Sequence, residues 1–425
     1  VTDTSYMFTN CINLTEIINF DKFNTIKVTK MNHMFTNCSN LPKINFASNF
    51  KTDEVTNMSH MFNNCSRLSE LNLIHFNTPL VTDMKRMFSD CTNLTKINLD
   101  NFNAVKVLDM SYMFSNCVKL EEINLDGIGT DEVNDMSYMF INCTKLEKIN
   151  FKNSNANKVN DMSYMFSDCK KLNEINLMSF NTPKVKNLKN MFENCINMES
   201  IKQKFITSSV TNMEFMFNNC QKLKSIDISN FDLSSIESMN SIFKDCQNIN
   251  PIKFPSIKKS PFLTDMASMF SGCASLVSLD LTDFDTSQVE FMQELFKGCK
   301  SLEYLDISTF DTINVIQMES MFENCITIKN ISLKNFYTPN LKQIYNMFYN
   351  CISLTSIDIS NFDTYQITNF ANLFYNCYSL TSINLNSFIT YMVYDMSYMF
   401  YNCSSLTNIY LTSFNTINVK NMQLE

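Results

Sequence analysis

The chain has few of the residues that most catalytic sites need. It contains 4 glycines, 3 histidines and no tryptophan among 425 residues. Loops that cradle phosphates require several closely spaced glycines, and none is present. The last histidine is His75, and no nucleophile stands apart from the repeating pattern described below. We therefore expect no enzymatic activity, no cofactor and no metal site.

A positive charge excess and long apolar runs are also missing. Lysine and arginine number 34 against 42 acidic residues, giving a net charge of −8. Nucleic-acid binding needs a basic face, so we do not expect it. No apolar run approaches the roughly 18 residues of a membrane span. No signal peptide is visible and the first residue is Val1, so this segment neither shows nor excludes secretion.

Cysteine, in contrast, recurs regularly. The 16 cysteines lie 25 to 27 residues apart, and a phenylalanine stands three residues before each of them. A fixed period of this length is typical of stacked structural units that contact only their neighbours. We expect residues 1–425 to form a single continuous solenoid domain of about 16 repeats. Irregular coils are expected at 195–220, which is one residue short, and at 246–273, which is rich in proline.

Each repeat changes its hydrophobic period. The segment 81–102 represents the pattern V-x-x-M-x-x-M-F-x-N-C-x-x-L-x-x-I-x-L-x-x-F-x-T. Val81, Met84 and Phe88 share one face of a helix, whereas Ile97 and Leu99 alternate with polar neighbours as in a strand. The pattern predicts one short helix and one short strand per repeat of about 26 residues, hence an α/β repeat solenoid.

The predicted helix has recognisable ends. An aspartate such as Asp83 or Asp109 precedes the first methionine and suits a helix N-cap. The residue before every cysteine is asparagine, aspartate or glycine. These residues tolerate the left-handed conformation that ends many helices.

The cysteines form a single file, with one at the same position of each unit. Strands of neighbouring coils lie about 4.8 Å apart, which is within the Cα separation that disulfides allow. A free cysteine, however, is also a good small buried hydrophobe. We favour a reduced, buried cysteine ladder, with disulfides between neighbouring coils as the alternative.

The string Met-Phe-x-x-Cys-x-x-Leu-x-x-Ile-x-Leu-x-x-Phe-x-Thr resembles the repeats of BspA-like leucine-rich-repeat surface proteins and of lipoproteins of mycoplasmas and Listeria. This resemblance covers essentially the whole chain. It implies a leucine-rich-repeat-like right-handed coil with a parallel sheet on one face. It also implies an extracellular or cell-surface location and a role in adhesion.

Between the two inward aliphatic residues of each strand, one residue must face outward. It is asparagine in the early coils and often aspartate later, where Asp280 and Asp306 occupy consecutive coils. Stacked like charges repel, and a cation or a basic partner would relieve the repulsion, as would solvation and nearby lysines. The asparagines could form a structural ladder or present amides to a glycan. The candidate residues of this outward strand file are Asn45, Asn72, Asn98, Asn124, Asp280 and Asp306.

Tyrosine gathers near the end of the chain, with 11 of the 16 tyrosines between Tyr337 and Tyr410. Tyr349, Tyr375 and Tyr401 share one position of successive coils, where most other coils carry polar residues. We expect these three to form an exposed stacked file, and Tyr365 and Tyr391 to form a second pair. Exposed tyrosines are favoured at interfaces, so both sets are candidate partner-binding sites. A tolerated surface without a partner is the alternative.

These observations favour a non-enzymatic cell-surface repeat protein with an extended surface for adhesion, or for recognition of a protein or glycan on another cell or surface. One alternative is a structural filament or spacer that associates with itself through the solenoid ends. Another is an intracellular protein-binding scaffold with reduced cysteines.

Overall fold

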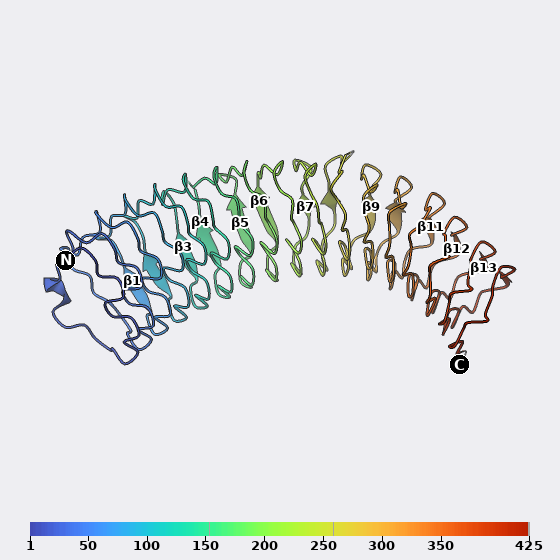
Figure 1. Cartoon of the computed structure of the whole chain (residues 1–425), viewed down its shortest axis with the longest axis horizontal. Helices are drawn as coiled ribbons and strands as arrows, with labels where there is room; N and C mark the ends of the chain where they lie inside the picture. Colours follow the sequence, from blue (N-terminus) through green and yellow to red (C-terminus); the bar gives the residue numbers. More distant parts are fainter. Residues whose placement is uncertain (153, 258, 424–425) are drawn as a thin grey trace. The chain divides into compact units, whose positions relative to one another are not determined.

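The computed structural model describes residues 1–152, 154–257 and 259–423. Two compact units, Val1–Val210 and Thr211–Glu425, are considered separately. Within each unit the chain winds into successive coils, and the short strands of neighbouring coils lie side by side in parallel (Figure 1). Each unit is therefore a β-solenoid of the leucine-rich-repeat type.

The strands are two to four residues long. In the first unit they are β1 (Glu70–Asn72), β2 (Lys96–Asn98), β3 (Glu122–Asn124), β4 (Lys148–Asn150), β5 (Glu174–Leu177) and β6 (Ser200–Gln203), preceded by the 3-10 turn η1 (Phe20–Lys22). In the second unit they are β7 (Ile226–Asp227), β8 (Ile252–Lys253), β9 (Ser278–Asp280), β10 (Tyr304–Asp306), β11 (Asn330–Ser332), β12 (Ser356–Asp358), β13 (Ser382–Asn384) and β14 (Asn408–Tyr410). The parallel strand in each repeat is confirmed where these strands form.

The prediction of one short helix per repeat is wrong. Apart from η1, the described residues contain no helix. The segment expected to be helical is a run of consecutive turns, which we call the turn ribbon; residues 109–117 are one example. Its N–H groups bond to carbonyls three residues back, as in Met113 to Met110 (3.2 Å) and Cys117 to Phe114 (3.2 Å). The predicted total of about 16 strand-and-helix repeats is therefore not supported, since the residues that the structure describes form fourteen strands and no repeated helix.

Alternate residues of the turn ribbon bond to the next coil. The N–H groups of Tyr112, Phe114 and Asn116 donate to the carbonyls of residues 137, 139 and 141, at 3.0, 2.9 and 2.8 Å. Because the intervening N–H groups are used within the turns, nearly every backbone donor of the ribbon has a partner. Buried backbone groups must be paired in this way, so the ribbon is as well satisfied as a helix would be.

The side-chain spacing of the ribbon explains the wrong prediction. Met110, Met113, Phe114 and Cys117 all point inward and are fully buried. Their spacing of three, four and seven residues is that of a helical face. Here it arises because the turns repeat every four residues, with the left-handed conformation at Tyr112 (φ 58°) and Asn116 (φ 60°).

The polar residues thought to cap helices serve these turns. The left-handed conformation before the cysteines is confirmed, for example at Asn116, but it recurs four residues earlier as well. Asp109 caps no helix. Its Oδ1 accepts the N–H of Ser111 at 2.8 Å, an Asx turn that starts the ribbon.

The interior is built from columns of identical residues. Phe88, Phe114 and Phe140 stack with centroid separations of 5.2 and 5.3 Å. Buried thiols donate to a phenylalanine carbonyl of the preceding coil, as Cys143 does to Phe114 at 3.1 Å and Cys169 does to Phe140 at 3.2 Å. All 16 cysteines are free, and all but Cys11 and Cys403 are buried. The reduced ladder is thus what this structure contains.

The prediction of a single continuous domain over 1–425 remains a prediction, as do the two irregular coils. Within 246–273, strand β8 has only two residues and the peptide bond between Asn250 and Pro251 is cis.

Thiol chemistry tests the ladder. Burial raises the pKa of Cys91 and Cys143 to about 12. Because only the thiolate reacts, we expect a disulfide reagent at pH 8 to label at most Cys11 and Cys403 rapidly in the native chain. All 16 thiols should react in denaturant. Rapid native labelling of most thiols, or fewer than 16 in the denatured chain, would contradict a buried and reduced ladder.

The left-handed positions predict a pair of matched variants. Asn142 has φ 59°, and its amide donates to Asn116 Oδ1 at 3.0 Å. Asn142→Ala and Asn142→Gly both remove this bond, but only alanine is strained at positive φ, by about 1–2 kcal/mol. Urea denaturation should therefore show Asn142→Gly to be the more stable variant by about 1 kcal/mol. Equal stabilities would mean that position 142 is not left-handed in solution.

Candidate functional site

Tyr349, Tyr375 and Tyr401 form the stack that the sequence predicts, in the second unit. Their ring centroids lie 4.6 and 4.7 Å apart, with nearly parallel planes. Tyr398 packs edge-on against Tyr375 and Tyr401. All four side chains are half-buried rather than fully exposed. The inner ring, Tyr375, is covered by a neighbour on each side, so this stack offers ring edges and hydroxyls more than open faces.

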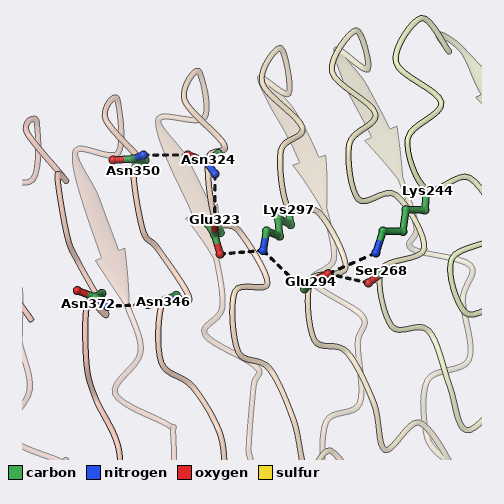
Figure 2. Close-up of polar contacts among 9 residues, drawn as sticks. All are labelled: Lys244, Ser268, Glu294, Lys297, Glu323, Asn324, Asn346, Asn350 and Asn372. Carbon is green, nitrogen blue, oxygen red and sulfur yellow. Dashed lines mark hydrogen bonds and ion pairs between the residues drawn. The ribbon is translucent and has the colours of Figure 1, made fainter. Parts of the chain in front are cut away.

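Amide ladders run beside the tyrosine stack. Asn350 donates to Asn324 at 2.9 Å, and Asn372 donates to Asn346 at 3.0 Å (Figure 2). Such ladders repeat along neighbouring coils and satisfy one acceptor and one donor of each interior amide.

An ion-pair network occupies the same part of the ribbon in the preceding coils. Lys297 bonds to Glu294 at 2.9 Å and to Glu323 at 3.2 Å, and Glu294 also lies 3.8 Å from Lys244 (Figure 2). The hydrogen bond from Lys297, its ion pairing and the Ser268 hydroxyl outweigh burial and lower the pKa of Glu294. Because these charges compensate one another, we interpret the network as a stabilising contact between coils and not as a binding site.

Tyr365 and Tyr391 meet edge-to-face, with centroids 5.3 Å apart. They belong to an exposed aromatic and aliphatic cluster on one corner of successive coils, which we call the corner patch. Its members are the exposed Tyr337, Tyr365, Ile389, Met392 and Tyr394 and the half-buried Tyr391. In an earlier coil this corner carries polar Asn103 and Lys106 together with exposed Val105 and Leu108. The aromatic rings therefore distinguish the corner patch, and exposed aliphatic side chains do not. Tyr365 is 53% exposed, Tyr337 56% and Tyr394 46%, so large apolar surfaces face solvent together.

The outward strand file proves to be a row of turn-forming side chains. Oδ1 of Asn72, Asn98 and Asn124 each accepts the N–H two residues ahead, at 3.1, 2.9 and 3.1 Å. Asp280 and Asp306 accept in the same way from Thr282 and Ser308, at 3.0 Å each. Asparagine and aspartate are thus interchangeable as acceptors that end the strand. Asn45 is exposed at the same position.

A groove in the second unit brings Asp280 and Asp306 together with a residue that the sequence analysis missed. Tyr304 stands two residues before Asp306 on β10 and is 69% exposed. The groove has a volume of about 1030 Å³ and is also lined by Glu303 and Lys329. Tyr304 pairs across the strands with Ser278. The only signal in the sequence was a tyrosine at a position where neighbouring coils carry serine or asparagine.

The first unit has a comparable groove of about 670 Å³ on its strand face. There Glu70 pairs with Lys96, and Glu122 pairs with Lys148. The charges alternate along this face, so the two grooves differ in electrostatics although they share a backbone.

Another column of stacked aromatic side chains lies at left-handed backbone positions of the first unit. Tyr112, Tyr138 and Tyr164 stack at 4.4 and 4.6 Å, and the Arg86 guanidinium lies 4.1 Å from the Tyr112 ring. His33 and His60 stack at the same position at 4.4 Å. Burial lowers the pKa of His60 to about 4, which suits a neutral stacked ring better than a metal ligand.

Among the residues that the structure describes, no group of three or more histidine, cysteine or acidic side chains is arranged for a metal ion. Within the same residues, no helix has the length and hydropathy needed to cross a membrane.

Fold and surface together define a leucine-rich-repeat solenoid with aromatic patches. The chain belongs to the family described as "Mycoplasma protein of unknown function, DUF285", which matches residues 2–124, 93–199, 118–222, 172–257, 264–383 and 328–424. The resemblance to BspA-like leucine-rich-repeat proteins is confirmed at the level of the fold. No curated protein matches the sequence significantly.

Solved structures of bacterial leucine-rich-repeat proteins resemble the chain. One from Bacteroides ovatus is 20% identical over 88% of each chain, with a TM-score of 0.56. A leucine-rich cell surface protein from Faecalibacterium prausnitzii is 16% identical over 90% of this chain and 83% of its own, with a TM-score of 0.38. At these identities the likeness concerns the fold, and only the first match is close enough in three dimensions to support it.

The tyrosine pair makes a pH-dependent prediction. The hydrogen bond between Tyr365 and Tyr391 raises the pKa of Tyr391 to about 12. A raised tyrosine pKa contributes stability that is present below pH 10 and is lost as the pH rises towards 12. We expect Tyr365→Phe to move the Tyr391 pKa towards 10, measured by NMR of ¹³C-labelled tyrosine rings. Tyr337→Phe is the control; an unchanged Tyr391 pKa in Tyr365→Phe would show that the two tyrosines do not hydrogen-bond.

Proposed function

We propose that the chain is a non-enzymatic recognition protein of the cell surface or extracellular space, and that it binds a protein partner through the second unit. The corner patch carries the proposal. Monomeric proteins rarely expose contiguous apolar patches of more than a few hundred Å², and larger patches often mark sites of interaction. Tyrosine and methionine are enriched at the centres of protein interfaces, whereas lysine and aspartate, common elsewhere on this surface, are depleted.

The corner patch is a better contact surface than the tyrosine stack. In the stack, Tyr375 is sandwiched between Tyr349 and Tyr401, so a partner would reach mainly hydroxyls and edges. In the corner patch, Tyr365 and Tyr394 are about half exposed and can be desolvated on binding. Buried aromatic anchors of this kind supply most of the binding energy at protein interfaces.

The surface location is supported by the fold and not by a targeting signal. Leucine-rich-repeat solenoids offer extended surfaces on which many side chains can contact one partner. The BspA-like repeats that the sequence resembles belong to surface proteins, and we extend that location, and a role in adhesion, to this chain as part of the proposal.

The test is to measure binding of the full chain to panels of extracellular proteins and of glycans. The affinity of each variant is then measured for any ligand found. The triple variant Tyr365→Ser, Tyr391→Ser, Tyr394→Ser should lower the affinity for a protein ligand at least about ten-fold, since interface tyrosines often contribute more than 1 kcal/mol. Tyr112→Ser with Tyr138→Ser removes two stacked tyrosines from the first unit and serves as the matched control.

The proposal fails if the corner-patch variant binds as tightly as the unsubstituted chain, or if the control variant loses as much. Thermal melts of each variant separate lost contacts from lost folding. Binding to glycans alone would redirect the function towards carbohydrate recognition.

A further inference from the structure

The groove on the strand face of the second unit combines an open aromatic ring with unpaired carboxylate oxygens. In the described part of the chain, the Tyr304 ring has no contact with another aromatic ring, unlike Tyr375 in the stack and Tyr365 in the corner patch. Its strand neighbour Ser278 is small, and Asn330 takes the equivalent position one coil further. At 69% exposure, the Tyr304 ring is accessible to a ligand.

The two aspartates each use one oxygen and leave the other free. Oδ1 of Asp280 accepts the N–H of Thr282 at 3.0 Å and its hydroxyl at 2.7 Å. Oδ1 of Asp306 accepts from Ser308 at the same two distances. Within the described residues neither Oδ2 has a hydrogen bond or an ion pair. The bonds from Thr282 lower the pKa of Asp280, so that carboxylate stays ionised at neutral pH.

The charge of the groove is unbalanced. Its lining residues that are charged at neutral pH are Asp280, Glu303, Asp306 and Lys329, three acidic groups against one lysine. Asp280 and Asp306 are paired directly across β9 and β10, where like charges repel. The groove of the first unit, in contrast, places a lysine beside each glutamate and needs no external charge.

We propose that this groove receives a basic segment of the partner protein, with an arginine or lysine head over the Tyr304 ring and against the free oxygens of Asp280 and Asp306. Carboxylates and an aromatic face together suit a cation. The inference rests on the proposed function, because it names the chemistry of the protein that binds. It adds a charged contact to the apolar contact at the corner patch.

The probe is the labelled peptide acetyl-Gly-Arg-Gly-Arg-Gly-amide, compared with the same peptide carrying citrulline in place of arginine. Citrulline keeps the shape of arginine and removes its charge. Fluorescence anisotropy at low ionic strength should show the arginine peptide binding the full chain at least about five-fold more tightly than the citrulline peptide, since each exposed charge contact contributes up to 1 kcal/mol.

Three variants locate the site. The double variant Asp280→Asn, Asp306→Asn keeps both turn acceptors, because asparagines accept the same bonds in the first unit. It should lower the affinity for the arginine peptide about five-fold. Tyr304→Ala should weaken it about three-fold, whereas Tyr304→Phe keeps the ring and the affinity. Asp358→Asn is the control for loss of a surface carboxylate outside the groove, because Asp358 makes the same turn with Ser360 but does not line the groove.

Four results would overturn the inference. These are no binding of the arginine peptide at about 5 mM, equal binding of the citrulline peptide, an equal loss with Asp358→Asn, and unchanged binding by the groove variants. Equal binding of citrulline would indicate a neutral polar ligand such as a saccharide. If the peptide fails while the corner-patch variant still loses its protein partner, only this inference falls and the proposed function stands.

Discussion

The backbone hydrogen bonds between neighbouring turn ribbons are the interaction on which the rest of the structure depends. A strand of three residues can supply only a few bonds to the next coil, as β3 does to β4. The ribbon adds four more from one coil, from Met110, Tyr112, Phe114 and Asn116. These bonds fix the distance between coils. They also force every inward residue into a column, which is why the same phenylalanine and cysteine recur in each repeat.

Surface chemistry follows from the same register. A residue at one position of the repeat always lies over its equivalent in the next coil, so a single substitution pattern becomes a line of side chains. Where the repeated position carries asparagine, the amides form a ladder of hydrogen bonds. Where it carries an aromatic residue, the rings stack, as Tyr138 does on Tyr112. Charges must alternate or find partners, as the lysines and glutamates around Lys297 do. At the corner patch, aromatic rings stay exposed to solvent, and beside Tyr304 the aspartate charges lack a partner. We therefore propose that these two places contact a partner protein.

Much of this could be predicted from the sequence. The period, the parallel strands, the outward file and the stacking of Tyr349 on Tyr375 all follow from counting residues, because identical positions must meet in a stack. The turn ribbon could not be predicted in this way. Its inward residues have helical spacing, and the left-handed position at Tyr112 is held by a residue type that disfavours positive φ. The degree of exposure was also not predicted: Tyr375 was expected to be exposed, yet its ring is half-buried between two neighbours.

Amide hydrogen exchange of the full chain, resolved by residue, tests the central claim most directly. The ribbon bonds predict that the N–H groups of Tyr112, Phe114 and Asn116 exchange as slowly as those of strand β3, because both sets bond to the next coil. Fast exchange of these three amides beside slow exchange in β3 would mean that the strands alone hold the coils together, and would contradict the account.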